Sequence, residues 1–109
     1  MRLWHLNEIE TPNAMRSPVV LGSEDSRAVL IRLDPGQEMG EHQVRERAWV
    51  VVVSGAAEIV SGEETIAAPE GTLLEFDPTE RRTVRSADGC RLLILLAPWP
   101  GPGHYPEPA

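Results

Sequence analysis

The chain of 109 residues has room for one domain with one hydrophobic core. Hydrophobic residues make up 41% of it and charged residues 25%, which is ordinary globular composition and excludes a disordered chain. Its formal net charge of −7, with no basic block, would repel a phosphate backbone and excludes nucleic acid as a partner.

Residues 1–17 are interpreted as an N-terminal extension, or arm, ahead of the folded domain. The arm mixes apolar and polar residues, and its segment 3–6 is expected either to add a strand or to pack across a subunit boundary. The chain turns polar too early for a secretory leader, and its longest apolar runs, 48–53 and 92–100, are shorter than the ~20 residues that span a bilayer. We therefore expect a soluble, cytoplasmic protein with no membrane partner.

Short runs rich in β-branched residues and leucine follow the arm and are separated by glycine and proline. The runs cover residues 28–33, 48–53, 57–60, 64–67, 72–76, 82–85 and 91–97. Evenly spaced strands with tight turns are typical of an antiparallel sandwich or barrel, so we expect an all-β domain over residues 18–97. Cys90, the single cysteine, precedes the last run and is expected to be a buried structural thiol.

The breaks between the runs carry specific turn residues. Asp-Pro-Gly at 34–36 places proline and glycine where a type II turn requires them. Ser-Gly at 61–62 and Asp-Gly at 88–89 are expected to close tight hairpins. The acidic runs at 38–41 and 63–64 are expected to be solvated turns.

Residues 98–109 form a C-terminal tail. Five of these twelve residues are proline, which is too many for a central strand. We expect the tail to run over the surface in an extended form. Trp99 and Tyr105 are expected to anchor it there rather than to contact a ligand.

Two spaced motifs relate the chain to a known superfamily. Gly36 is followed after five residues by His42, and Gly55 stands where this first motif closes. Gly71 opens a second motif, which continues into residues 77–79. With this framework of turns, the chain resembles the cupin superfamily, and in particular small single-domain cupins of the cupin 2 type. The resemblance implies an antiparallel double-stranded β-helix, or jelly-roll, barrel.

The resemblance also implies four metal-ligand positions, which hold histidines and a glutamate in metal-binding cupins. Here these positions read His42, Val44, Ala48 and, in the simplest alignment, Arg82. Only His42 can ligate a metal, and one imidazole supplies a fraction of the roughly 10–16 kcal/mol that a complete ligand set gives to a structural zinc. We therefore predict a degenerate metal site and no cofactor. A divalent metal held by a reduced ligand set is the alternative.

An apolar pocket with a few polar groups is expected in place of the metal site. Because residues of a strand alternate between its faces, residues 42 to 48 of even number share one face. The predicted ligand-binding residues are His42, Val44, Glu46, Ala48 and Arg82. Arg82 and a neighbouring arginine would bind a carboxylate or enolate through charge-assisted hydrogen bonds, which favours a small-molecule ligand.

The same residues permit an enzymatic hypothesis. His42 is the predicted catalytic residue, a general base near neutral pH whose tautomer Glu46 would fix. Such a pair suits proton transfer next to a carbonyl, as in an isomerase or cyclase that uses no metal.

Several alternatives stay open at this point. Glu46 and Arg82 can form an internal ion pair or turn outward at the barrel rim, which would leave a purely structural or interaction barrel. A metal-dependent oxygenase or isomerase with a reduced ligand set is a further possibility. The second motif also permits a shift by one residue, which would put Arg81 or Thr83 in the place given to Arg82.

Apolar residues at outward positions predict a homodimer. Trp49, Val51 and Val53 have outward parity in their strand, and Leu3 and Trp4 add apolar surface from the arm. Left exposed, these residues would form an apolar patch of the kind that soluble monomers avoid.

Overall fold

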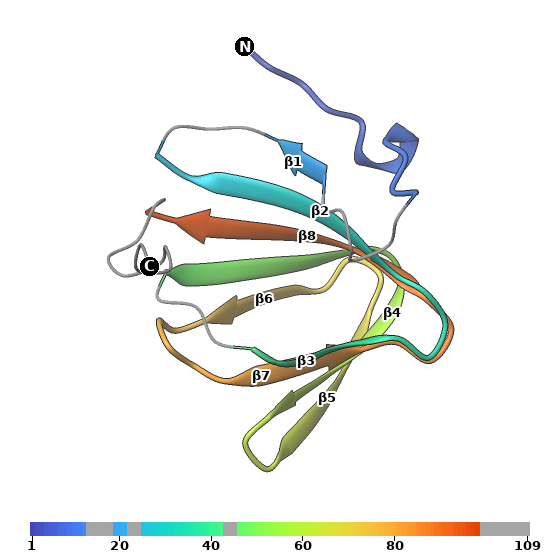
Figure 1. Cartoon of the computed structure of the whole chain (residues 1–109), viewed down its shortest axis with the longest axis vertical. Coiled ribbons are helices and arrows are strands. Elements are labelled where there is room, and N and C mark those ends of the chain that lie inside the picture. Colours follow the sequence, from blue (N-terminus) through green and yellow to red (C-terminus); the bar gives the residue numbers. More distant parts are fainter. Residues whose placement is uncertain (13–18, 22–24, 43–45, 99–109) are drawn as a thin grey trace, which may run out of the picture.

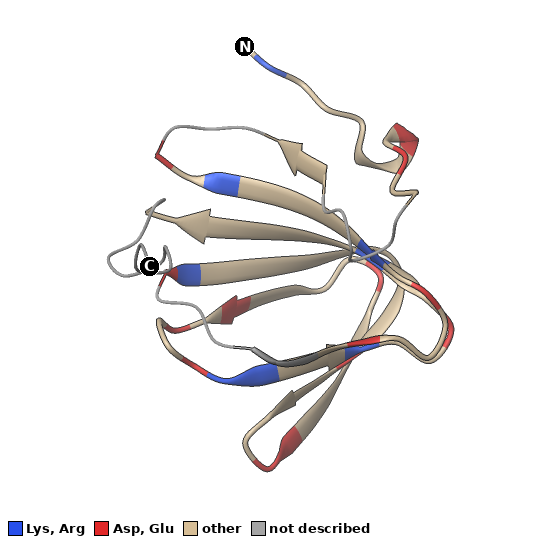
Figure 2. Ribbon diagram, viewed as in Figure 1, with Lys and Arg blue, Asp and Glu red and all other residues tan. Residues whose placement is uncertain are grey.

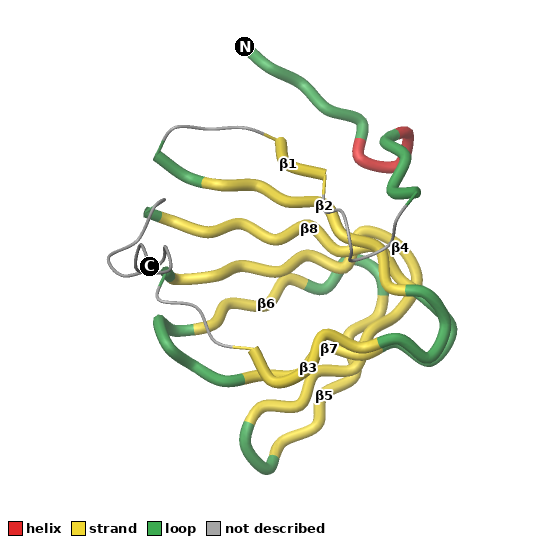
Figure 3. Tube along the Cα trace, viewed as in Figure 1, coloured by secondary structure: helices red, strands yellow, loops and turns green. Residues whose placement is uncertain are grey.

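Eight strands and one short 3₁₀ helix form the fold in the computed structural model, which describes residues 1–12, 19–21, 25–42 and 46–98 (Figure 1, Figure 3). In chain order the elements are η1 (Leu6–Glu8), β1 (Val19–Leu21), β2 (Arg27–Leu33), β3 (Glu38–His42), β4 (Arg47–Ser61), β5 (Glu64–Pro69), β6 (Leu73–Phe76), β7 (Arg82–Arg85) and β8 (Cys90–Ala97). All strand pairs are antiparallel. The all-β prediction is confirmed.

Two sheets share the long strand β4. One sheet has the order β1-β2-β8-β4-β6, and the other has the order β5-β4-β7-β3. The first half of β4 pairs with β8 and β6, while its second half pairs with β5 and β7. The strands therefore curl around a common interior (Figure 1). This is the predicted double-stranded β-helix barrel.

A glycine lets β4 leave one sheet and enter the other. The register of β4 shifts at a bulge just before Gly55, which has a φ of +75°. A Cβ atom on Gly55 would lie 2.3 Å from the carbonyl oxygen of Gly89, so a larger residue would displace backbone. The prediction of two separate strands at 48–53 and 57–60 is wrong, because the glycine here bends a strand instead of ending it.

The core lies between the two sheets and takes its residues from the inward positions of the strands. Its buried members are Ile31, Leu33, Ala48, Val50, Val52, Ala57, Ile59, Ala68, Phe76, Val84, Cys90, Leu92 and Leu96. The place of Cys90 among them confirms the buried thiol, and burial raises its pKa, which suppresses the reactive thiolate.

Two of the three predicted turns are confirmed. Gly36 has a φ of +80° in a turn closed by a backbone hydrogen bond of 2.9 Å, as a type II turn requires. The turn predicted at 61–62 is present as a hairpin: β4 ends at Ser61, β5 begins at Glu64, and the two-residue loop 62–63 joins them. The hairpin expected at 88–89 is wrong. This loop joins β7 in one sheet to β8 in the other, so the two strands do not pair.

Two edge strands, β1 and β3, were not expected. The acidic run at 38–41, expected as a solvated turn, lies in β3 instead. There Glu38 pairs with Arg85 and Met39 pairs with Val84. Glutamate and glycine have low strand propensity, so only the neighbouring strand reveals this element.

The N-terminal arm projects from the barrel on the side of β1 (Figure 1). Its segment 3–6 forms no strand, and η1 begins where that segment ends. Predictions for residues 13–17, for Val44 and for the tail from Trp99 onward lie outside the described residues. Within the described part of the chain, no helix is long and apolar enough to cross a membrane.

Candidate functional site

A cavity of about 150 Å³ lies inside the barrel, between the two sheets. Its lining residues are Val29, Ile31, Met39, Val50, Arg82, Val84, Ile94 and Leu96. Among the described residues that line it, Arg82 is the one charged residue and the others are apolar. The cavity therefore has the composition of a small-molecule site, with an apolar wall and one strong polar group.

Strand register explains how these residues meet. On one sheet, Val29 of β2 pairs with Ile94 of β8, which in turn pairs with Val50 of β4. On the facing sheet, Met39 of β3 pairs with Val84 of β7. Residues that pair across strands point to the same face, so the two rows form opposite walls of the cavity.

Arg82 occupies an unusual position for a charged residue, because only 4% of its surface is exposed. Its guanidinium carbon lies 4.6 Å from the centroid of the Phe76 ring, within the range of a cation–π contact. Its Nη1 lies 3.5 Å from the carbonyl oxygen of Glu80, which is beyond the usual length of a hydrogen bond. Burial lowers the pKa of Arg82, and the negative charge of Glu80 partly opposes this shift.

The Glu80 carboxylate is engaged elsewhere. One of its oxygens accepts from the Ser61 hydroxyl at 2.9 Å, and the other accepts from the backbone N–H of Asp77 at 3.1 Å. Among the described residues, no carboxylate forms an ion pair with Arg82. Arginine keeps its proton under physiological conditions, so a positive charge stands at the wall of an apolar cavity.

The structure decides which residue of the second motif faces inward. Arg82 is buried, whereas Arg81 is exposed and Thr83 is partly exposed. Of the five predicted ligand-binding residues, Arg82 is the described residue that lines the cavity. The backbone of His42 pairs with that of Arg82 across β3 and β7. The His42 side chain and all of Val44 lie outside the described part, so their predicted roles stay predictions.

Glu46 and Ala48 are buried but do not line the cavity. Glu46 is 1% exposed and Ala48 is fully buried in the core, and neither lines the cavity. Because Glu46 and Arg82 are both buried, the alternative in which they turn outward at the rim is wrong. The ion pairs between described residues include none that joins Glu46 to Arg82.

The residues at the metal-ligand positions do not fit a metal ion. Ala48 carries no donor atom and packs in the core, and Arg82 brings a buried positive charge to its position. In the described segments, no three residues of the types His, Cys, Asp and Glu are grouped so that they could hold a metal. The two described side chains at these positions therefore offer a cation no donor atom.

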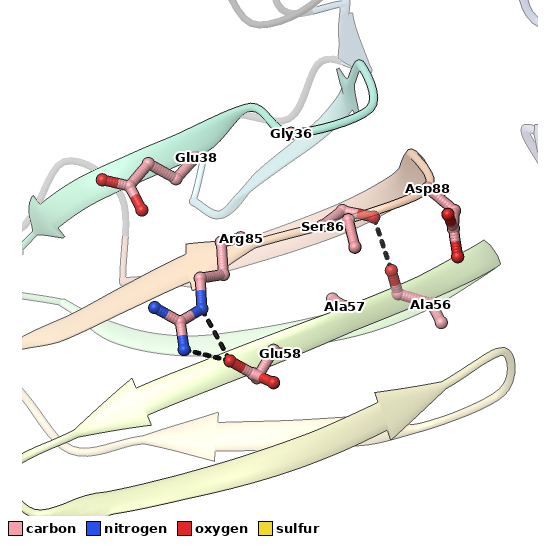
Figure 4. Close-up of a pocket in the computed structure, with 9 residues that line it drawn as sticks. Gly36, Glu38, Ala56, Ala57, Glu58, Arg85, Ser86 and Asp88 are labelled. Carbon is pink, nitrogen blue, oxygen red and sulfur yellow. Dashed lines mark hydrogen bonds and ion pairs between the residues drawn. The ribbon is translucent and has the colours of Figure 1, made fainter.

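A second hollow, of about 280 Å³, lies on the outer face of β3, β7 and β4 (Figure 4). Arg85 donates from Nε and Nη2 to one carboxylate oxygen of Glu58, and Glu38 stands nearby on β3. The Ser86 hydroxyl donates to the carbonyl oxygen of Ala56 at 2.6 Å. Although this hollow is larger, its arginine, Arg85, already pairs with Glu58, and both side chains are nearly half exposed. The barrel cavity is therefore the better candidate site.

The sequence analysis missed most of the cavity wall. Apart from Arg82, the lining residues are ordinary aliphatic residues and methionine, and no motif marks them. The available signal is the alternation within residues 28–33 and 91–97, which aims Val29 and Ile94 at the interior. Met39 gives no such signal, because its strand was not predicted.

Comparisons with known proteins identify the fold. No family model matches the sequence, and no curated protein is significantly similar to it. Among solved structures, an RmlC-like cupin from Desulfovibrio desulfuricans is 26% identical, with a TM-score of 0.75 over 90% of this chain and 97% of that one. Protein TT1209 from Thermus thermophilus is 25% identical, with a TM-score of 0.76 over 90% and 98%.

A protein from Shewanella frigidimarina that contains a cupin-2 domain has a TM-score of 0.69 at 17% identity, over 78% of this chain and 83% of that one. Together with the double-stranded β-helix topology, these likenesses define the class: the chain has the fold of a small single-domain cupin. They show the fold and carry no ligand or activity over to this chain.

Proposed function

We propose that the barrel binds a small carboxylate, with Arg82 recognising the anion and the apolar wall holding its hydrocarbon part. The observation that supports this most strongly is a buried guanidinium, 4% exposed, at the wall of an otherwise apolar cavity. An arginine presents its donors as a planar fork, which suits the two oxygens of a carboxylate.

Electrostatics favour an anionic ligand over a neutral one. Removing a guanidinium from water is costly unless an opposite charge compensates, and attraction between charges is far stronger in a protein interior than in water. The Glu80 carboxylate accepts hydrogen bonds from Ser61 and Asp77 and forms no ion pair with Arg82, so its charge offsets the desolvation of Arg82 only in part. A bound carboxylate would supply a direct counter-charge.

The size of the cavity restricts the ligand. At about 150 Å³ it lies below the roughly 300–1,000 Å³ of pockets that hold drug-sized molecules. The described part of its wall offers aliphatic side chains and the thioether of Met39, with no charged group besides Arg82. The expected ligand is therefore a short aliphatic acid with one carboxylate.

Thermal unfolding with a matched pair of ligands tests this proposal. Isobutyrate should raise the melting temperature, because a ligand at about 100 times its Kd stabilises the folded state by about 2.7 kcal/mol. Isobutyramide, which has nearly the same shape and no charge, should have no comparable effect. An equal response to the two ligands, or no response to a panel of short carboxylates, would contradict the proposal.

Two arginine variants locate the binding site. Arg82→Gln should abolish the response to isobutyrate, whereas Arg85→Gln, on the same strand but on the outer face, should keep it. If Arg82→Gln does not fold, the carboxylate and amide comparison on the wild-type protein still decides whether charge is recognised. An unchanged response in a folded Arg82→Gln protein would remove Arg82 from the site.

A second candidate function adds catalysis to this binding site. It is supported by the backbone pairing of His42 with Arg82 across β3 and β7. His42 would take a proton from the carbon beside a carbonyl of the bound acid. Exchange of the C3 protons of a short 2-oxo acid in D₂O, followed by NMR, should be accelerated by the protein and not by His42→Ala. Equal exchange rates with the wild-type protein and His42→Ala would contradict the catalytic role, and only the binding function would stand.

A further inference from the structure

A third hollow, of about 220 Å³, lies where the end of β2 and the start of β8 meet the middle of β4. Arg32, Asp34, Ser54 and Arg91 supply the polar part of its lining. We call it the arginine hollow. Figure 2 shows basic residues at the point where β2 and β8 converge. The arginine hollow shares no lining residue with the barrel cavity or with the outer hollow, so it is a separate place in the fold.

Strand register sets the two arginines of the hollow side by side. Arg32 of β2 pairs with Arg91 of β8, and Arg91 pairs in turn with Ser54 of β4. Paired residues point to the same face, with Cβ atoms about 4.5–5.5 Å apart. The next pair along, Leu33 with Cys90, is buried in the core, so the arginines point to the outer face. Two guanidiniums and one hydroxyl therefore form a row across three strands.

The charges in this row are not balanced. Like charges at directly opposite positions of two strands repel each other. Asp34 compensates one of them, because its carboxylate accepts from Nε of Arg32 at 2.9 Å. Arg91 forms no ion pair with a described residue. Two positive side chains against one negative side chain leave the hollow with one positive charge in excess, although the whole chain has a net charge of −7.

The N-terminal arm holds both guanidiniums in place. Nη2 of Arg32 donates to the carbonyl oxygen of Pro12 at 3.3 Å, and Nη2 of Arg91 donates to the carbonyl oxygen of Ile9. These acceptors are neutral, so they leave the excess charge as it is. A guanidinium has five N–H donors, and the hydrogen bonds between described residues do not use Nη1 of either arginine. The pair is therefore fixed in position and still has donors to offer.

We infer that the arginine hollow binds a phosphate group, either the free ion or the phosphate of a small ester. Arg32 and Arg91 would each donate to phosphate oxygens, and the Ser54 hydroxyl would add a third donor. The negative charge of the phosphate would offset the excess positive charge and relieve the repulsion between the guanidiniums. Both arginines are partly exposed, so a dissolved anion can reach them.

Phosphate suits this hollow better than a carboxylate or a nucleic acid. The two oxygens of a carboxylate lie in one plane and match the fork of a single guanidinium. A phosphate is tetrahedral, so its oxygens can contact donors that come from three different strands. A nucleic acid would bring many phosphates close to a chain whose net charge is −7, which would repel them. The expected ligand is therefore a small molecule or ion with one phosphate group.

Titration calorimetry of the full chain with inorganic phosphate, at an ionic strength held constant with sodium chloride, tests the inference. We expect a dissociation constant below about 1 mM. A parallel titration with glycerol 3-phosphate distinguishes the two sources of the phosphate group. Tighter binding of glycerol 3-phosphate would identify an ester as the ligand, and tighter binding of inorganic phosphate would identify the free ion. Absence of binding for both at about 10 mM would overturn the inference.

Arginine variants locate the site. Arg32→Gln and Arg91→Gln should each raise the dissociation constant for inorganic phosphate at least about tenfold, because each removes a charged donor. The control, Arg47→Gln, changes the net charge equally at the start of β4, where Arg47 pairs with Glu75 and Asp77, and should leave the constant unchanged. Equal effects of the three variants would mean that the ion responds to overall charge only, which would overturn the inference.

Two further measurements keep the result decisive. If Arg91→Gln does not fold, Arg91→Lys keeps the charge but loses the planar fork, so it should weaken phosphate binding several-fold, and undiminished binding would overturn the inference. Saturating isobutyrate should not change the dissociation constant for phosphate, because the barrel cavity and the arginine hollow share no lining residue. Phosphate binding that is lost in Arg82→Gln and kept in Arg91→Gln would place the anion in the barrel and overturn the inference.

Discussion

Arg82 and Arg85 are three residues apart on β7 and lie on opposite faces of the same sheet. Arg85 stands on the outer face, where Glu58 pairs with it and the side chains of both are nearly half exposed. Arg82 stands on the inner face, 4% exposed, with the Phe76 ring beside it and no carboxylate among its described ion-pair partners. The same residue type thus has two different environments on one short strand.

The comparison indicates which of the two arginines is the better candidate to bind an anion. The outer arginine already has its counter-charge in a solvated setting, where an ion pair contributes little. The inner arginine is desolvated and forms no ion pair with a described residue, so we expect an anion to gain most by binding there. The larger outer hollow is for this reason the weaker candidate.

The largest effect on stability is expected where β4 crosses from one sheet to the other. Without this crossing the two sheets would not enclose an interior. Gly55→Ala should lower the free energy of unfolding by at least about 3 kcal/mol, since the new Cβ would meet the Gly89 carbonyl oxygen and the φ of +75° disfavours alanine. Urea denaturation measures the loss. Gly62→Ala, with a φ of +61° but open space around it, is the control and should lose about 1 kcal/mol. Similar losses for both variants would show that the contact with Gly89 is unimportant.

The next effect distinguishes the two arginines directly. Without ligand, Arg82→Met should raise the free energy of unfolding by about 1 kcal/mol, because an apolar side chain replaces a buried charge. Arg85→Met should lower it slightly, through loss of an exposed ion pair. Urea denaturation of both variants measures the difference. A loss of more than about 2 kcal/mol in Arg82→Met would mean that the guanidinium holds the fold together instead of awaiting a ligand.

A smaller effect is expected from the outer pair alone. Glu58→Gln should change the free energy of unfolding by about 0.5 kcal/mol or less, because both side chains are exposed and screened by water. The change should disappear at 1 M salt, where the Debye length is about 3 Å. A larger or salt-independent change would mean that water and salt do not screen the Glu58–Arg85 pair. The outer hollow would then resemble the buried cavity in its electrostatics.

The smallest effect is the response of carboxylate affinity to pH. A burial-lowered pKa of Arg82 means that affinity declines first at strongly alkaline pH, when the guanidinium loses its proton, and not near neutrality. Titration calorimetry between pH 6 and 9 should therefore give a constant affinity. An inflection near the usual histidine pKa of about 6.5 would instead assign part of the binding to His42.

Much of the fold follows from local sequence. The apolar runs predict β2, β5, β6, β7 and β8, and turn residues such as Gly36 and the pair at 61–62 predict where the chain reverses. The alternation of strand residues also predicts that Val29 and Ile94 share one face with their paired neighbours, because side chains alternate between the two faces of a strand. These features depend on residues close together in the chain, which is why the sequence by itself determines them.

Other features depend on contacts between distant segments. The strand β3 forms because β7 lies beside it, and the Asp-Gly pair at 88–89 becomes a crossing between sheets because its flanking strands find different partners. Gly55 bends β4 because the Gly89 carbonyl lies against it. The cavity combines residues of five strands, and Glu46 and Ala48 are buried outside it despite their predicted parity.

The candidate site shows the same division. Residue identity settles that the four positions taken from the resemblance to cupins read His42, Val44, Ala48 and Arg82, and the sequence therefore predicts that a histidine-rich ligand set is missing. Only the tertiary structure decided that this arginine lines an apolar cavity and that the Glu80 carboxylate accepts hydrogen bonds from other groups. Burial and partners arise from packing between strands that are far apart in the chain, and this packing makes Arg82 a candidate anion site.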